Sequence, residues 1–143
     1  KSDDHVHYHA GFRVYRDGVL QDYSGYQYMN YVPCSEHDAK KSSAEEQIEK
    51  AHLHDSVGDV VHVHRRGAMW GDLFKNINVE LPEPVIGFVN GAKVEDIMNM
   101  PIESYSTAII EAGTNATSHE KEVVSVDYIK QVEAKSELCG TGE

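Results

Sequence analysis

Residues 5–16 read HVHYHAGFRVYR, and their apolar side chains recur at every second position. This two-residue alternation, rich in valine, tyrosine and phenylalanine, predicts a β-strand. The dipeptide Asp17-Gly18 that follows is a strong turn signal, and residues 19–23 can return as a second strand. The N-terminal stretch therefore predicts a β-hairpin whose first strand carries three histidines on one face.

The rest of the chain alternates between strand and helix patterns. Strands are predicted over residues 57–64, 86–89, 93–94 and 105–111, with Asn90-Gly91 as the turn of a hairpin. Helices are predicted over residues 43–51 and 69–77, and from the capping box Thr117–Glu120 to about residue 136. Residues 24–41 form a long tyrosine-rich loop between these elements. The fold class predicted is α+β, with a mostly antiparallel twisted sheet and two or three helices.

Composition limits the kinds of partner. The chain has 143 residues, of which 40% are hydrophobic and 26% charged, as expected for one globular domain spanning residues 1–143. Its formal charge of −11 and the absence of a large basic cluster argue against nucleic acid and anionic membranes as partners. No apolar run is long enough to predict membrane insertion.

Two cysteines, Cys34 and Cys139, lie far apart and outside any CxxC motif. We expect one disulfide between them, which implies an extracytoplasmic location: periplasmic, cell-surface or secreted. Two unrelated thiols are one alternative, and a zinc site that uses them together with distant histidines is another. The first residues, Lys1-Ser2-Asp3-Asp4, suit the start of a mature exported protein and also a trimmed chain.

Seven of the nine histidines lie in alternating arrays. These arrays are His5, His7 and His9; His52 and His54; and His62 and His64. On a strand, residues i and i+2 point to the same side about 6.6 Å apart. Two such imidazoles can converge on one metal ion, while a neighbouring strand supplies a third ligand. The arrays therefore predict a transition-metal site. Neutral imidazole suits zinc, copper, nickel or iron, and zinc or copper is the ion expected here.

The pairs at 52/54 and 62/64 are the favoured ligands, because they are close in sequence and flank a turn. If their segments are antiparallel, four imidazoles meet on one face. Asp55, beside His54, is the favoured carboxylate to orient a ligating histidine. The array of His5, His7 and His9 either completes this site, forms a second one, or lies at a frayed strand end.

The order of these motifs resembles that of small uncharacterised exported His-rich domains of bacteria and archaea. HxHxH with Asp17-Gly18 comes first, then HLHD and HVH, then WGDLF and FVNG, over residues 5–113. The segment from IGFVNGAKV to YSTAIIEAG resembles the second half of a β-grasp domain. HVH at 62–64 is similar to the copper site of copper–zinc superoxide dismutase, although that family's bridging histidine motif is missing. The HxH-plus-one-histidine pattern is similar to α-type carbonic anhydrases, which are much longer.

Three functions stay open at this level. The first is an extracytoplasmic binding domain that captures, buffers or delivers zinc or copper. The second is a metalloenzyme whose three-histidine zinc or copper site catalyses hydration, hydrolysis or superoxide dismutation. The third is a structural zinc site that stabilises a small domain. A homodimer through the sheet or the tyrosine-rich loop is an alternative to a monomer.

Overall fold

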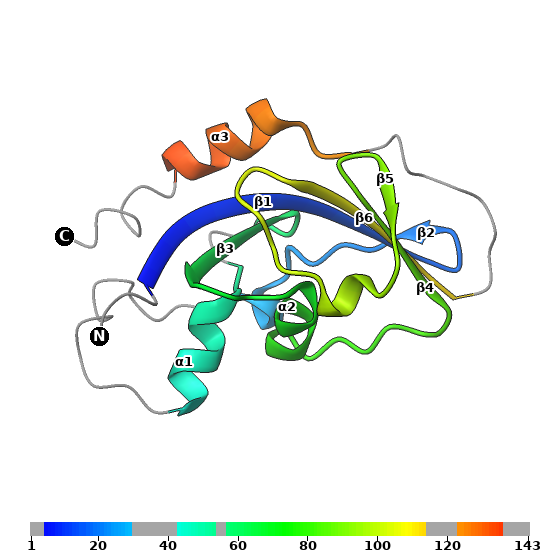
Figure 1. The fold of residues 1–143 in the computed structure, drawn as a ribbon, viewed down its shortest axis with the longest axis horizontal. Coiled ribbons are helices and arrows are strands. Elements are labelled where there is room, and N and C mark those ends of the chain that lie inside the picture. Colours follow the sequence, from blue (N-terminus) through cyan, green and yellow to red (C-terminus); the bar gives the residue numbers. More distant parts are fainter. Residues whose placement is uncertain (1–4, 30–42, 54–56, 114–122, 136–143) are drawn as a thin grey trace.

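The computed structural model describes residues 5–29, 43–53, 57–113 and 123–135. Six strands form one sheet in the order β2-β1-β6-β4-β5, and β3 pairs with β1 outside this path (Figure 1). The strands are β1 (His5–Arg16), β2 (Val19–Leu20), β3 (Val60–Arg65), β4 (Val85–Val89), β5 (Ala92–Val94) and β6 (Thr107–Ala112). The helices are α1 (Ser43–Lys50), α2 (Trp70–Asn76) and α3 (Val126–Lys135).

Strand β1 is the organising element, since it pairs with three other strands. It is antiparallel to β2 and β3 but parallel to β6, from Gly11 opposite Thr107 to Arg16 opposite Ala112. The α+β class is confirmed, but the expectation of a mostly antiparallel sheet is wrong because the sheet is mixed and curled. Alternation within a strand shows which side chains share a face, and it does not show which strand becomes its neighbour.

The main hydrophobic core lies between the sheet and the helices α1 and α2 (Figure 1). Even-numbered residues of β1, such as Phe12, point into it and meet Trp70 and Phe74 of α2, with ring centroids 5.8 and 6.1 Å away. Val61 and Val63 of β3 join the same core. The opposite residues of β1 and β3, including their histidines, therefore face the other side of the sheet.

Helix α3 covers that other side (Figure 1). Its Ile129 packs with Val124 and Val60 in a second, smaller hydrophobic cluster. Gly11 of β1 permits this close approach, because a Cβ there would lie 2.9 Å from Val124 Cβ and 3.0 Å from Ile129 Cδ1. Any side chain at residue 11 would therefore push α3 away from the sheet.

Several element boundaries differ from the sequence prediction, and β2, for example, ends at Leu20 rather than at residue 23. Helix α3 begins at Val126, because residues 123–125 are not helical and the Ser125 hydroxyl accepts the backbone N–H of Tyr128 at 3.1 Å. The capping box Thr117–Glu120 lies outside the described residues. Strand β3 begins at Val60 rather than at residue 57.

The predicted disulfide is not tested, since Cys34 and Cys139 both lie outside the described residues. Most of the tyrosine-rich loop lies outside them as well. Within the described ranges, no helix combines the length and apolar character needed to cross a membrane.

Tyr23 provides a test of the main core. Its ring is buried at 5% exposure, and its hydroxyl has no hydrogen-bond partner among the described residues. Burial raises the pKa of Tyr23 from 10.0 to about 12. The folded state thus binds the phenolic proton more tightly than the unfolded state does, and this contribution to stability is present below about pH 10 and lost as pH rises through about pH 12. We expect the free energy of unfolding to fall by about 1.4 kcal/mol per pH unit in this window because of Tyr23.

The measurement is denaturant unfolding across this pH range for the wild type and for Tyr23→Phe. The variant keeps the ring and removes the ionisable group, so its stability should fall less steeply. Other tyrosines titrate in both proteins and cancel in the difference. Equal slopes for the two proteins would show that Tyr23 ionises in the folded state as it does in water.

Candidate metal centre

Five histidines gather on the face of the sheet that α3 partly covers. His9 of β1 lies directly opposite His62 of β3. On the other edge of β3, His52 exchanges both backbone hydrogen bonds with His62, at 3.0 and 2.9 Å. His9, His62 and His52 therefore lie in one row across three neighbouring segments. His7 and His64 lie beside this row, because residues i and i+2 of a strand point to the same side of the sheet.

The five imidazoles form a closed ring of contacts. Their centroids are 4.3 Å apart for His9–His62, 5.8 Å for His62–His52 and 4.9 Å for His52–His64. The ring closes through His64–His7 at 4.7 Å and His7–His9 at 5.0 Å. Ten imidazole nitrogens are thus concentrated in one small volume, which is the donor chemistry that zinc and copper prefer.

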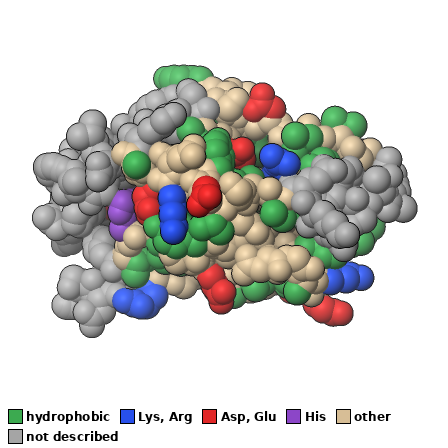
Figure 2. Space-filling view, turned by 90° about the horizontal axis from the view of Figure 1, so that it is seen from above, with side chains coloured by type: hydrophobic (Ala, Val, Ile, Leu, Met, Phe, Trp, Pro, Cys, Tyr) green, Lys and Arg blue, Asp and Glu red, His purple; other side chains and the backbone are tan. Residues whose placement is uncertain are grey.

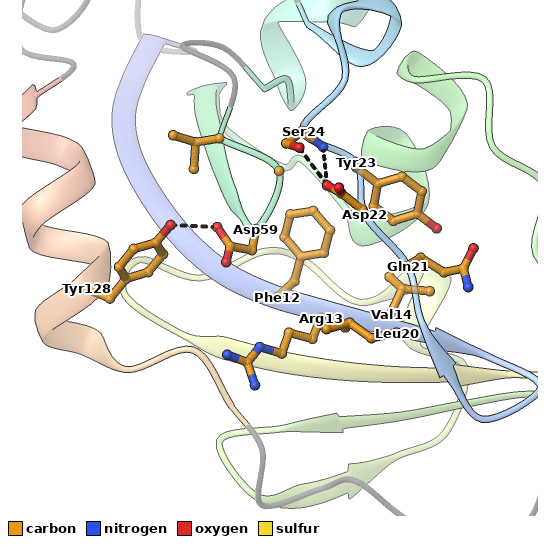
Figure 3. Close-up of a pocket in the computed structure, with 12 residues that line it drawn as sticks. Phe12, Arg13, Val14, Leu20, Gln21, Asp22, Tyr23, Ser24, Asp59 and Tyr128 are labelled. Carbon is orange, nitrogen blue, oxygen red and sulfur yellow. Dashed lines mark hydrogen bonds between the residues drawn. The ribbon is translucent and has the colours of Figure 1, made fainter.

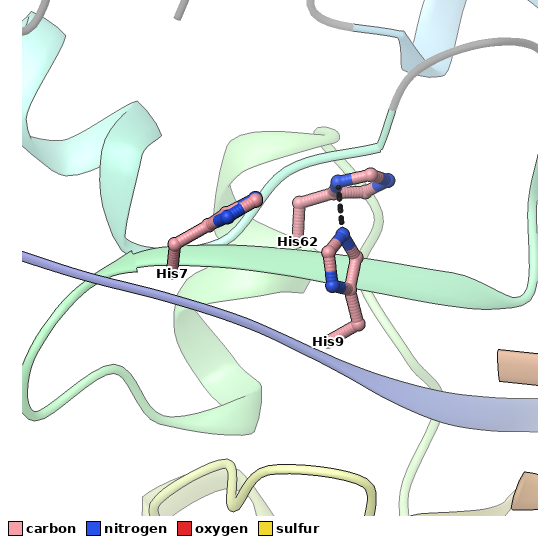
Figure 4. A group of neighbouring side chains, drawn as sticks. All are labelled: His7, His9 and His62. Carbon is pink, nitrogen blue, oxygen red and sulfur yellow. Dashed lines mark hydrogen bonds between the residues drawn. The ribbon is translucent and has the colours of Figure 1, made fainter. Parts of the chain in front are cut away.

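Three members of the ring approach closely enough to share one ion. One ligand nitrogen from each of His7, His9 and His62 lies within 4.8 Å of the other two (Figure 4). In a tetrahedral zinc site with bonds of about 2.05 Å, ligand nitrogens are about 3.4 Å apart. Small side-chain rotations would shorten the nitrogen–nitrogen separations from at most 4.8 Å to this value, so the three residues fit a zinc-sized ion.

The three candidate ligands differ in access to solvent. His9 and His62 are fully buried, whereas His7 is exposed. The pairing of β1 with β3 is irregular between His5 and Tyr8, so His7 lies next to a bulge. Bulges reorient side chains at the end of a ladder. The site is therefore open to solvent at His7 and buried at His9 and His62.

A carboxylate on α3 holds His9. Glu133 Oε2 lies 2.9 Å from His9 Nδ1, and the Tyr105 hydroxyl donates a hydrogen bond to Glu133 Oε1. Burial by itself would raise the pKa of Glu133, but the hydrogen bonds from Tyr105 and His9 outweigh it and lower this pKa. Glu133 is therefore ionised at neutral pH and can only accept, so His9 Nδ1 carries the proton and donates.

The tautomer of His9 determines the next hydrogen bond. His9 Nε2 lies 2.9 Å from His62 Nδ1 (Figure 4). In neutral His9 with its proton on Nδ1, Nε2 has a lone pair and accepts, so His62 Nδ1 donates. This lone pair is aimed at His62 Nδ1. A metal ion that binds both nitrogens must displace the proton between them.

The structure brings together part of the ligand set expected from sequence. His52, His62 and His64 lie side by side, and the antiparallel pairing considered from sequence takes the form of a single bridge between His52 and His62. His7 and His9 belong to the same cluster, but His5 lies in β1 with its side chain outside the described part. His54 and Asp55 also lie outside the described residues, so their roles stay predictions.

Sequence reasoning missed Glu133. It lies far from every histidine array along the chain, and its helix was predicted only from a capping box and apolar spacing. The only available signal was its position next to Val132, on the flank of the helix face that packs against the sheet. Which sheet residue that flank would meet depends on how α3 docks.

The comparisons with known proteins identify no relative. No protein-family model matches the chain, and neither a curated protein nor a solved structure matches it. The fold and the site alone therefore describe the kind of protein. It is an α+β domain with a histidine cluster whose donor atoms suit a transition metal. The resemblance to exported His-rich domains stays a prediction.

A separate cavity lies further along β1. It has a volume of about 440 Å³ and is bordered by β1, the segment after β2, the loop before β3 and α3 (Figure 3). Tyr128 of α3 donates a hydrogen bond of 3.0 Å to Asp59 at one wall of this cavity, and Arg13 lies nearby. This contact ties the start of α3 to the start of β3, which carries His62 and His64.

Proposed function

We propose that this chain is an extracytoplasmic transition-metal-binding domain that binds zinc or copper through His7, His9 and His62. The observation that carries the proposal is the convergence of three imidazole nitrogens within 4.8 Å. Neutral imidazole is a ligand for both metals, and within the described part of the chain no thiolate joins this group. The formal charge of −11 favours cation approach.

His52 and His64 complete the ring and support a binding role. They stack on His62 and His7 and place further imidazole nitrogens beside the three proposed ligands. Either could replace a ligand during metal entry or release, because exchange between adjacent donors needs only side-chain rotation. An arrangement with spare ligands suits capture and delivery of an ion.

Exposure of His7 also favours exchange over a purely structural role. Structural zinc sites are closed by four protein ligands, whereas here one of three ligands faces solvent. Histidine atoms reach the surface beside acidic and basic side chains in Figure 2. We therefore place metal capture and delivery first among the candidate functions.

A metalloenzyme is the second candidate, and the number of ligands is the observation that favours it. Three histidines leave one position on a tetrahedral ion for water, as in catalytic zinc sites. In such a site the metal lowers the pKa of bound water and creates a nucleophile. Carbon dioxide hydration, ester hydrolysis and, with copper, superoxide dismutation are the reactions to assay.

The primary test is titration of the metal-free, untagged chain with Zn²⁺ and with Cu²⁺. We expect saturable binding of one ion per chain and a higher melting temperature with metal, since an ion at 100 times its dissociation constant adds about 2.7 kcal/mol of stability. A chain that stays folded in chelator supports capture and delivery, and one that unfolds supports the structural role. Absence of saturable binding by either ion would overturn the proposal.

A further inference from the structure

We infer that Glu133, held by Tyr105, is a positioning residue for the metal ligand His9, and that α3 delivers it to the site. The inference rests on the proposed function, because it assigns to a residue outside the histidine arrays control over how tightly that site binds metal. Neither residue binds the ion in this proposal. Both act through the ring of His9.

The geometry uses both oxygens of one carboxylate. Oε1 of Glu133 accepts from the Tyr105 hydroxyl, and Oε2 accepts from His9 Nδ1 at 2.9 Å. Two fixed partners leave the carboxylate little freedom to rotate. The plane of the His9 ring and the direction of its Nε2 lone pair are fixed in turn, toward His62 Nδ1 at 2.9 Å.

The chemistry follows from the proton on Nδ1. A histidine that donates one ring N–H to a carboxylate is locked in the tautomer that leaves its other nitrogen able to bind a metal. The negative charge also makes that nitrogen a stronger electron donor. Loss of such a partner typically lowers metal affinity about 10- to 100-fold.

Helix α3 determines where Glu133 lies. The helix is held to the sheet by Ile129, which packs toward Gly11, and by the hydrogen bond from Tyr128 to Asp59. The ammonium group of Lys130 lies 5.5 Å from the centre of the Tyr105 ring, which adds a cation–π contact. The position of α3 on the sheet therefore determines where Glu133 lies and, through it, the orientation of the His9 ring.

The test compares Glu133→Gln and Glu133→Ala with Asp127→Asn in the full chain. Asp127→Asn removes the same charge from an exposed position of the same helix. We expect Zn²⁺ affinity to fall about tenfold in Glu133→Gln, which keeps an acceptor, and up to about 100-fold in Glu133→Ala. Asp127→Asn should stay close to wild type.

A second measurement separates positioning from loss of structure. Ring-nitrogen NMR of the metal-free chain should show His9 protonated at Nδ1 in the wild type and in Asp127→Asn, and a shift toward Nε2 protonation in Glu133→Ala. A general loosening of the fold would broaden many resonances without selecting one tautomer of His9.

The outcomes distinguish this inference from the proposed function. Wild-type Zn²⁺ affinity and an unchanged His9 tautomer in Glu133→Ala would overturn the inference while the metal site stands. Absence of saturable Zn²⁺ and Cu²⁺ binding in the wild type would overturn the proposed function first. In that case the NMR result still reports whether Glu133 sets the tautomer of His9.

Discussion

His7→Ala is expected to bind Zn²⁺ on the order of a hundredfold more weakly than the wild type, while His64→Ala keeps nearly full affinity. The apparent binding energy of a four-ligand zinc site is about 10–16 kcal/mol, so one ligand accounts for about 3 kcal/mol. Each 1.4 kcal/mol corresponds to about a tenfold change in affinity. Of these two histidines, only His7 belongs to the group whose nitrogens converge within 4.8 Å.

The two substitutions form a matched pair. Both residues are histidines of HxH pairs, and their rings stack on each other with centroids 4.7 Å apart. Neither side chain is fully buried, so both variants should fold, and melting in chelator verifies this. Equal losses of Zn²⁺ affinity in the two variants would instead show that His64 contributes to ion binding as much as His7 does.

Phe12→Ala is expected to reduce the free energy of unfolding by about 3–5 kcal/mol, because it opens a cavity in the main core. Phe12 is 1% exposed and packs against Trp70, Phe74 and Tyr23. Domains of this size are stable by about 5–15 kcal/mol, so this single change removes a large part of the total. Denaturant unfolding at neutral pH measures the difference.

Tyr26→Ala provides the control for Phe12→Ala. It also removes an aromatic ring, but Tyr26 is 78% exposed, so its effect should stay within about 0.5 kcal/mol. Saturating Zn²⁺ should restore part of the stability of Phe12→Ala, because an ion that binds only the folded state shifts the equilibrium toward it. A loss below about 1 kcal/mol in Phe12→Ala would mean that the core collapses around the missing ring or that β1 packs differently.

Local sequence patterns predict an element well where the spacing of apolar side chains and the turn residues of the backbone favour the same structure. The alternation of residues 5–16 and the turn at Asp17-Gly18 predict β1 and its hairpin, and Asn90-Gly91 predicts the hairpin of β4 and β5. Each signal acts within a few residues, where steric limits on the backbone decide the conformation. The parallel pairing of β1 with β6 joins distant parts of the chain, and no local pattern encodes it.

In the candidate site, too, the sequence predicts the local features and long-range strand pairing decides the rest. The sequence predicts histidine pairs that share strand faces, and in the structure His62 and His64 both stack on His52. It does not predict that β1 pairs with β3 in a register that places His9 opposite His62. That register makes His7 and His9 members of the central group, whereas the sequence favours the pairs at 52/54 and 62/64.

By itself, the sequence determines the donor chemistry, because alternating histidines on strands put imidazoles on one face whatever their neighbours are. Only the tertiary structure decides which imidazoles converge and which carboxylate supports them. Strand register brings His9 and His62 to 2.9 Å, and the docking of α3 brings Glu133 to His9. Both depend on hydrophobic contacts between segments far apart in the chain, such as Gly11 with Ile129, so spacing along the sequence does not reveal them.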